Sequence, residues 1–488
     1  MTSLRSAAAR RWIALVVLCV GQLMIVLDAT VVNVALPSIQ HSLHTDQASL
    51  AWVINGYLIS FGGLLLLAGR LGDLLGRRRL FLAGVAIFTL ASALCGLAPT
   101  EGLLTAARFV QGVGAAVVSS MVLGILVTLF KSREQTARAM SIYAFVASAG
   151  GSIGLLVGGV LTQALGWHWI FFINLPIGIA AFVFGAILIP EHQGAGLRDG
   201  VDAWGAVLIT AAPALAVYAI LEAGTNGWTS VRTLGMAAVT AALIAAFIFV
   251  ESRAQHPLVP LRFFRSRNVA GAVLVRSLFP VGMFGSFFLG ALYLQRVLGY
   301  SPVGAGLAFM PMNICVALFS LLVTARVVNR FGAKATLIPG LVLMTAGLLL
   351  LGMAPVNAVY AVSVLPALLV MGVGAGLVFM PSVLLAMSGV SGSDAGLASG
   401  VANVAIQMGA AVGVAVLASI SAADTTGLVS RGASLNVALT SGYHLGFAVA
   451  ASCVAAAAIT GAIVLRSARP AARVHAPDVP LRNVDLAA

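Results

Sequence analysis

The 488-residue chain has little charge. Asp, Glu, Lys and Arg together make up 8% of it, whereas 60% is hydrophobic and the mean hydropathy is +1.06. A soluble domain carries roughly a quarter charged residues and under half apolar ones. This composition excludes an ordinary cytosolic enzyme, a disordered protein and a nucleic-acid-binding module.

Lysine is almost absent, and its two occurrences exclude one energy source. Neither Lys131 nor Lys334 follows a glycine, so the chain lacks a Gly-Lys-Ser/Thr phosphate loop and ATP cannot drive it directly. We also find no HExxH motif, nucleophile elbow or paired catalytic carboxylates, so we expect no enzymatic activity.

Cysteine is scarce as well, and its spacing indicates no cross-link or metal site. The four cysteines lie in separate apolar runs, which predicts neither a disulfide framework nor a zinc site. The seven histidines show no metal-ligand spacing either. We therefore expect no bound metal.

Long apolar runs are what the chain does contain. A helix crosses the hydrocarbon core with about 20 apolar residues, and helices satisfy their own backbone groups in lipid. Fourteen such runs predict an all-α integral membrane protein. Their approximate limits are 12–36, 48–69, 79–98, 102–129, 138–163, 168–190, 202–222, 233–251, 269–291, 303–325, 335–354, 359–381, 396–421 and 443–465.

The net charge of +13 is explained by placement of Arg and Lys between the runs. Most of these residues fall in the segments that would share one side, which the positive-inside rule assigns to the cytoplasm. We expect a multi-pass protein of the cell inner (cytoplasmic) membrane with both termini cytoplasmic, in contact with lipid and not with nucleic acid. The first run is too long for a signal peptide and is expected to be retained.

A short repeat predicts how the spans are grouped. Residues 70–78 (RLGDLLGRR) match residues 326–334 (RVVNRFGAK) at four positions: Arg70 with Arg326, Gly76 with Gly332, Arg78 with Lys334, and Asp73 with Asn329. Parallel duplication of a six-span unit gives such a pattern, although so short a match can arise by chance. The predicted division is a six-helix bundle in 1–190, a two-helix insert with a linker in 191–268, a second bundle in 269–465, and a disordered cytoplasmic tail in 466–488.

Three longer motifs carry a resemblance to a known family. Residues 69–79 (GRLGDLLGRRR) resemble the loop 2–3 signature of the major facilitator superfamily. Residues 27–37 (LDATVVNVALP) and 167–178 (WHWIFFINLPIG) resemble first- and sixth-span signatures of its fourteen-span drug:H+ antiporters, except that His168 stands where Arg is usual. The resemblance implies a major-facilitator-like fold with 6 + 2 + 6 spans and protons as the coupling ion, without another cofactor.

Asp28 is the only acidic residue deep inside a predicted span. A rise of 1.5 Å per residue places it about 22 Å above the inner surface, and places Arg108 about 9 Å below the outer one. In a core of about 30 Å these depths nearly coincide, so spans 1 and 4 can bring the two side chains together. Our hypothesis is that Asp28 is the protonation site, with a static structural ion pair as the alternative.

Two motifs near these residues have implied roles. Residues 108–114 (RFVQGVG), with Arg108 and Gln111, resemble the fourth-span motif implicated in proton transfer. The loop 2–3 motif implies gating by charge contacts, and the alternative is that its arginines only set topology. The gating residues are Gly69, Arg70, Gly72, Asp73, Gly76, Arg77 and Arg78.

Glycines cluster in the fifth span. Gly150, Gly154 and Gly158 share a face at a spacing of four, and Gly151 and Gly159 follow beside them. The cluster resembles the antiporter motif that limits leak, here with Leu155 where proline is usual, so a kink is in doubt. Ordinary helix packing is the alternative.

Other polar residues within spans are candidates for a substrate cavity, although each can equally form a helix–helix hydrogen bond. They are Gln22, Asn33, Asn55, Tyr57, Gln111, Gln295, Asn313, Asn403 and Gln407. Glu222 is expected to be solvated at a span end, and Arg276 is expected to snorkel toward the interface.

The sequence therefore predicts a monomeric, proton-coupled antiporter. Its expected cargo is amphipathic, often cationic, drugs or antibiotics, exported by alternating access around a central cavity. Two rivals stay open: a nutrient facilitator or symporter of the same fold, and a membrane receptor or scaffold that transports nothing.

Overall fold

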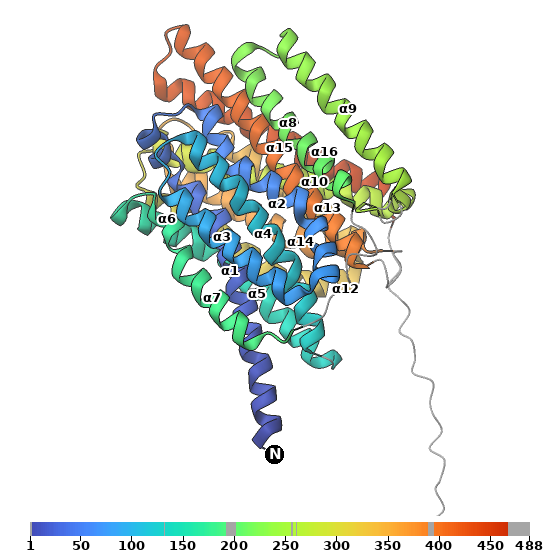
Figure 1. Ribbon diagram of the computed structural model, residues 1–488. Coiled ribbons are helices and arrows are strands. Elements are labelled where there is room, and N and C mark those ends of the chain that lie inside the picture. The colour runs from blue at the N-terminus through green and yellow to red at the C-terminus, as the bar shows by residue number, and fades with distance from the viewer. Residues whose placement is uncertain are drawn as a thin grey trace, which may run out of the picture.

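The computed structural model describes residues 2–130, 132–191, 202–254, 257–259, 261–388 and 395–466, and in these ranges the regular structure is helical without strands (Figure 1). Thirteen helices of the described part are long and apolar enough to cross a membrane. The remaining predicted span, 138–163, lies in α5 (Arg133–Leu165), whose stretch Ile153–Leu165 is apolar but shorter. The all-α membrane fold is thus confirmed. The predicted tail from 467 onward lies outside the described residues.

The first group of helices corresponds to the first six predicted spans. Its members are α1 (Thr2–Leu43), α2 (Gln47–Leu75), α3 (Arg77–Gly96), α4 (Glu101–Leu129), α5, α6 (Trp169–Phe172) and α7 (Asn174–Leu188). The span predicted at 168–190 is assigned as α6 and α7, which meet at a turn at Ile173, just before Asn174 and Pro176.

The insert and the second group follow. The insert consists of α8 (Ala203–Asn226) and α9 (Val231–Arg253). After a 3-10 turn at Leu261–Arg265 come α10 (Arg267–Leu292), α11 (Pro302–Leu318), α12 (Ala325–Phe331), α13 (Ala333–Leu351), α14 (Leu365–Ala386), α15 (Ala395–Ser430) and α16 (Leu435–Val464). π-helical segments at Tyr293–Val297 and Phe319–Thr324 extend α10 and α11, and another at Tyr360–Val364 precedes α14.

Short polar turns start the helices. A side-chain oxygen one residue before the helix accepts a backbone N–H of the first turn, which satisfies a group that would otherwise lack a partner. The capping residues are Asp46, Thr100, Ser132, Asp202, Ser230 and Ser301.

The two groups pack alike, as the repeat predicts. In the first, α1 packs on α5 and α7, and α4 packs on α2 and α3; in the second, α10 packs on α15 and α16, and α14 packs on α11 and α13. The repeat residues also correspond. Arg78 donates to the Ala186 carbonyl at the end of α7, and Lys334 donates to the Ala462 carbonyl at the end of α16, at 2.7 Å.

The groups join chiefly through two helix pairs, α2 with α15 and α5 with α11, and α1 makes smaller contacts with α10 and α11. The insert helix α8 packs on both α2 and α15, so it lies along the junction, whereas α9 packs chiefly on α8 at the edge of the bundle (Figure 1). The α5–α11 seam is tight, since a Cβ on Gly306 would come within 2.4 Å of the Leu155 carbonyl oxygen. A further contact joins the groups at α1, where the amide of Gln295, just after α10, donates to the Val34 carbonyl at 2.9 Å.

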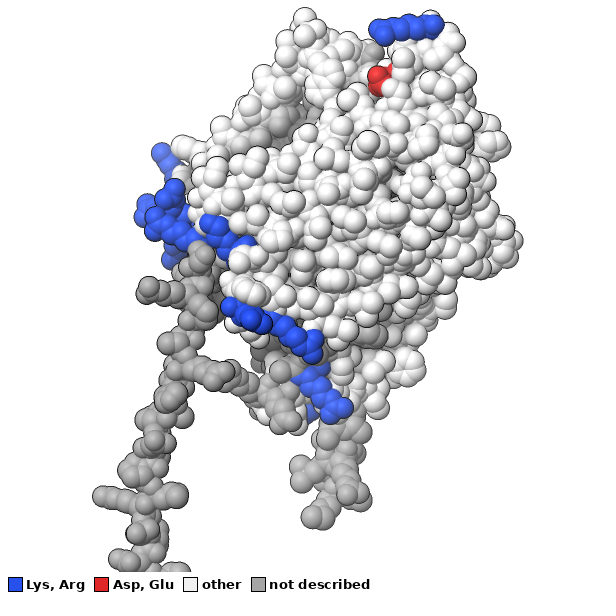
Figure 2. All heavy atoms as spheres, turned by 180° about the vertical axis from the view of Figure 1, so that it is seen from behind, with Lys and Arg blue, Asp and Glu red and all other residues white. Residues whose placement is uncertain are grey.

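The surface is apolar around its middle and basic at one end. Large apolar side chains such as Leu90, Phe184 and Val239 are exposed, as lipid contact requires. Figure 2 shows Lys and Arg gathered toward one end, and a basic side chain beside an acidic one at the other. We call the end that carries Arg77–Arg79 and Lys334 the Arg-rich end.

Glycine is required at the two equivalent turns between helices. Gly76 and Gly332 adopt φ of +98° and +90°, where a Cβ is strained. Gly76→Ala is expected to lower the free energy of unfolding by about 1–3 kcal/mol. Thermal unfolding of the purified protein measures this. Gly69→Ala is the matched control, because its Cβ would meet nothing within 4 Å. Equal stability of the two variants would contradict the assignment.

Candidate proton-coupling site and cavity

Asp28 and Arg108 meet inside the first helix group. Asp28 lies on α1 and Arg108 on α4, and the guanidinium Nη1 donates to the carboxylate Oδ2 of Asp28. Their side chains are 0% and 1% exposed. The two charges therefore compensate each other without access to water in this state.

Arg108 is held by more than its carboxylate. Its Nε donates to the Val53 carbonyl of α2 at 2.9 Å, and its Nη1 also donates to the Gln111 Oε1 at 2.8 Å. The guanidinium carbon lies 4.3 Å from the centre of the Tyr57 ring, within reach of a cation–π interaction. Arg108 thus connects α1, α2 and α4.

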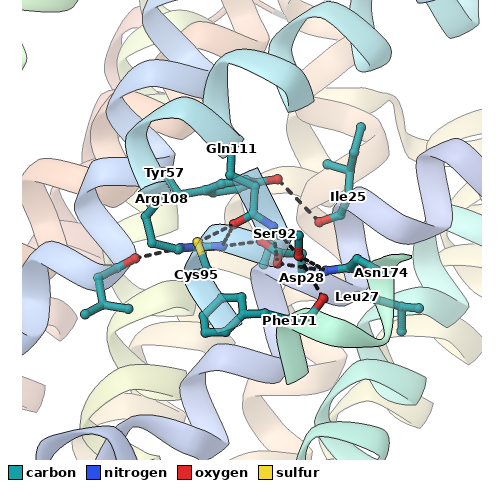
Figure 3. Close-up of polar contacts among 12 residues, drawn as sticks. Ile25, Leu27, Asp28, Tyr57, Ser92, Cys95, Arg108, Gln111, Phe171 and Asn174 are labelled. Carbon is teal, nitrogen blue, oxygen red and sulfur yellow. Dashed lines mark hydrogen bonds and ion pairs between the residues drawn. The ribbon is translucent and has the colours of Figure 1, made fainter. Parts of the chain in front are cut away.

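Three polar side chains complete the site around Asp28 (Figure 3). Gln111 and Asn174 donate their amide groups to the carboxylate Oδ1, at 2.8 and 3.2 Å. The same two amides reach the Ser92 hydroxyl, at 3.1 and 3.0 Å, and that hydroxyl donates to the Phe171 carbonyl. Asp28 is therefore bound from α4 and α7, with Ser92 of α3 bridging the donors.

Ser92 and Asn174 were not anticipated from the sequence. Asn174 lies in the sixth-span motif, where a single amide inside an apolar run was the available signal. Ser92 offers less, because serine often bonds to its own helix backbone. Its Oγ instead accepts from two other helices.

The loop 2–3 residues form contacts at the Arg-rich end. Asp73 pairs with Arg77 four residues later, at 2.9 Å, on a largely exposed surface. Arg77 also donates to the Gly124 carbonyl of α4 at 2.7 Å. Asp73 thus forms its ion pair with a residue only four positions away, across the α2–α3 turn. Arg77 and Arg78 bond the same loop to α4 and α7.

The glycines of α5 allow close approach to two different helices. A Cβ on Gly154 would come within 3.2 Å of the Leu27 carbonyl oxygen, next to Asp28, and one on Gly158 within 2.8 Å of the Val31 Cα. Gly150 faces α1 too. Gly159 instead faces α11 in the second group, where a Cβ would meet the Pro302 carbonyl oxygen at 2.6 Å. The helix α5 is continuous through Leu155.

His168 stacks on Trp167 with ring centres 3.8 Å apart. Burial lowers the pKa of the His168 imidazole, which favours its neutral form at the position where the family motif usually has an arginine.

A cavity of about 1070 Å³ opens at the Arg-rich end, between the two groups and the α9–α10 linker. Leu65 and Leu66 of α2 and Leu258 of the linker give it an apolar wall. Its charged lining residues are Arg70, Asp73, Arg77, Glu251, Arg262 and Arg265. The volume is sufficient for a drug-sized molecule.

Of the polar residues expected to line a cavity, only Asn403 lines this one. Four lie buried in the first group, and Gln111 belongs to the Asp28 site. The others contact neighbouring backbone or are partly buried, because short polar side chains also serve helix packing. The four buried residues are Gln22, Asn33, Asn55 and Tyr57. Gln295 donates to the Val34 carbonyl and Asn313 to the Phe309 carbonyl. Gln407 is partly buried near Gly62.

Arg276 corrects another expectation. It does not snorkel: it is 3% exposed and donates to the Ala402 carbonyl, the Ser382 hydroxyl and the Asn403 amide oxygen. Glu222 pairs with Arg232 at 2.8 Å at the end opposite the Arg-rich end. The four cysteines are free.

Comparison with known proteins decides the family. The family model described as Major Facilitator Superfamily matches residues 18–414. The chain belongs to the major facilitator superfamily. Membership confirms the resemblance seen in the motifs and indicates a multi-pass membrane transporter rather than an enzyme.

Several superfamily members of similar sequence are resistance or export proteins. The chain is 38% identical to the puromycin resistance protein pur8 of Streptomyces alboniger, over 90% of this chain and 88% of that protein. It is 36% identical to the cephamycin export protein CmcT of Amycolatopsis lactamdurans, over 85% of this chain and 86% of that protein. A bacterial homologue of the human lysosomal transporter Spinster, solved in an inward-facing and unoccupied conformation, has a TM-score of 0.66 at 16% identity, over 93% of this chain and 96% of that one, which shows the fold.

Proposed function

We propose that this chain is a proton-coupled antiporter that exports amphipathic drugs or antibiotics from the cell. The names of its relatives support the export of such compounds. The observation that carries proton coupling is the fully buried Asp28–Arg108 pair in a membrane-spanning bundle. Ionisable groups at such depth are expensive and are typically found where ions or substrates pass.

The chemistry follows from what a proton does to the Asp28 carboxylate. As an anion it accepts from Arg108, Gln111 and Asn174. A proton on one oxygen adds a donor and removes the charge that compensates Arg108. The guanidinium must then find another partner or water, because a buried charge without compensation is unstable. Protonation of Asp28 therefore loosens the contacts of α1 with α4 and with α7.

The cavity supplies the cargo site in this proposal. It lies at the Arg-rich end, which the positive-inside rule assigns to the cytoplasm. At the opposite end the α5–α11 seam is closed by Gly159 and Gly306. An export cycle would load cargo here, open the far seam, and exchange cargo for a proton on Asp28. We propose that the chain does this as a monomer in the inner membrane, with both termini cytoplasmic and protons as the coupling ion.

Proton-driven exchange in inverted vesicles tests the proposal. We expect puromycin, added to vesicles with an acidified lumen, to release lumenal protons, and the chain to raise puromycin resistance in an efflux-deficient host. Vesicles without the chain are the control. Proton entry into the lumen together with the compound would indicate a symporter. Failure of a panel of antibiotics and nutrients to move would indicate a receptor or scaffold.

A further inference from the structure

Glu251 is a buried carboxylate to which the sequence motifs assign no role. It lies two residues before the last residue of α9, in the two-helix insert, and is 3% exposed. Its Oε2 accepts the backbone N–H of Val259 at 3.3 Å. Its Oε1 is buried and has no hydrogen-bond partner among the described residues. A carboxylate oxygen left in this state is unfavourable unless a ligand or proton satisfies it.

The unpartnered group belongs to the cavity wall. Glu251 is one of the residues that line the cavity, next to Pro257 and Leu258 of the linker. Leu258 and Val259 belong to one apolar cluster with Leu65 and Leu66 of α2. The carboxylate thus stands beside an apolar surface, an arrangement that suits a molecule with a cationic group on a hydrophobic body.

The surrounding charges leave Glu251 available. The ion pairs seen among the described residues do not involve it. Asp73 pairs with Arg77, whereas Arg70, Arg262 and Arg265 line the same cavity without an ion pair to Glu251 in the described structure. Asp202, which caps α8, places a second negative charge near Glu251. Its Oδ2 also lacks a hydrogen-bond partner in the described part of the chain. The insert therefore adds negative potential to a basic cavity mouth.

We propose that Glu251 of the insert binds the cationic group of an amphipathic cargo while Leu65, Leu66 and Leu258 hold its apolar body. The inference rests on the proposed export function and names its binding residue. It also gives the insert a task, since α9 supplies one wall of the cavity as well as a surface for lipid.

Equilibrium binding of two dyes tests this assignment without requiring transport. The purified chain in lipid nanodiscs is titrated with rhodamine 6G, a cation, and with Nile red, which is neutral, and empty nanodiscs give the background. Glu251→Gln is expected to weaken rhodamine 6G binding roughly tenfold or more, because a charge partner in a desolvated site is lost. The dissociation constant of neutral Nile red is expected to change by no more than about twofold in the same variant, far less than the tenfold change expected for rhodamine 6G.

The matched control is Glu222→Gln, a glutamate of the same insert at its other end, paired with Arg232. It is expected to bind both dyes like the parent. Unchanged rhodamine 6G binding in Glu251→Gln would overturn the assignment, and so would equal weakening of both dyes or equal weakening in both variants. If Glu251→Gln weakens only rhodamine 6G binding, but the parent chain moves no protons in vesicles, the antiporter proposal is wrong and the assignment of Glu251 as a cation-binding residue is kept.

Discussion

Asp28→Asn is expected to reduce proton-driven export to the level of vesicles without the chain. Asparagine cannot take up a proton near neutral pH, so the exchange of cargo for a proton loses its carrier. The variant should also lose about 3–5 kcal/mol of stability, because Arg108 is then a buried charge without compensation. Export of puromycin from proteoliposomes and thermal unfolding of the purified protein measure the two effects.

A double variant separates coupling from stability. Asp28→Asn combined with Arg108→Gln removes both charges and leaves polar groups of similar size. Stability should largely return, since replacing a whole buried pair is often neutral, while export stays absent. Export by either variant that still depends on the pH gradient would contradict a proton-carrying role for Asp28. Restored export in the double variant would indicate the static ion pair instead.

Gly159→Ala is expected to make the protein leak protons. A Cβ at this position would come within 2.6 Å of the Pro302 carbonyl oxygen and 2.9 Å of the Val303 Cα. Both are backbone atoms, so α5 and α11 must separate, at a cost of roughly 1–3 kcal/mol. The seam between the two groups would then close poorly. Proteoliposomes containing the variant should lose an imposed pH gradient faster than those with the parent chain and should export less.

The control lies on the same helix. A Cβ on Gly151 would meet nothing within 4 Å, so Gly151→Ala tests glycine content without a clash. Gly306→Ala introduces a clash at the same seam from the α11 side, where the added Cβ would lie 2.4 Å from the Leu155 carbonyl oxygen. It should leak like Gly159→Ala. If Gly159→Ala holds the gradient as well as Gly151→Ala does, the seam is not the barrier.

The fold could be predicted from the sequence because span length and apolarity follow from bilayer thickness. The depth argument also brought Asp28 and Arg108 together correctly, since rise per residue is constant in a helix. Span length and apolarity do not predict the turn at Ile173; the local signal is Pro176, which lacks the N–H that would continue the helical hydrogen bonds. The division into 1–190, 191–268 and 269–465 stays a prediction, although the packing repeats in both groups.

The cavity was harder to predict than the ion pair. Hydropathy does not tell a polar side chain that faces a cavity from one that bonds to a neighbouring helix, so Asn55 and Tyr57 appeared equivalent to Asn403. Glu251 was missed for a different reason. A glutamate at the end of a span usually faces water, and its burial depends on the linker that folds back over it through Val259. Such a return of the chain leaves no periodic signal.

The position of α8 has a mechanical consequence. It rests on both α2 and α15, so when the two groups tilt apart in the proposed export cycle we expect it to slide along one of them. We expect α9, which packs chiefly on α8, to move with it. Glu251 would then be displaced relative to Leu65 and Leu66 at the moment the far side opens. In the proposed cycle, the same carboxylate would therefore bind the cationic cargo and, once displaced, release it.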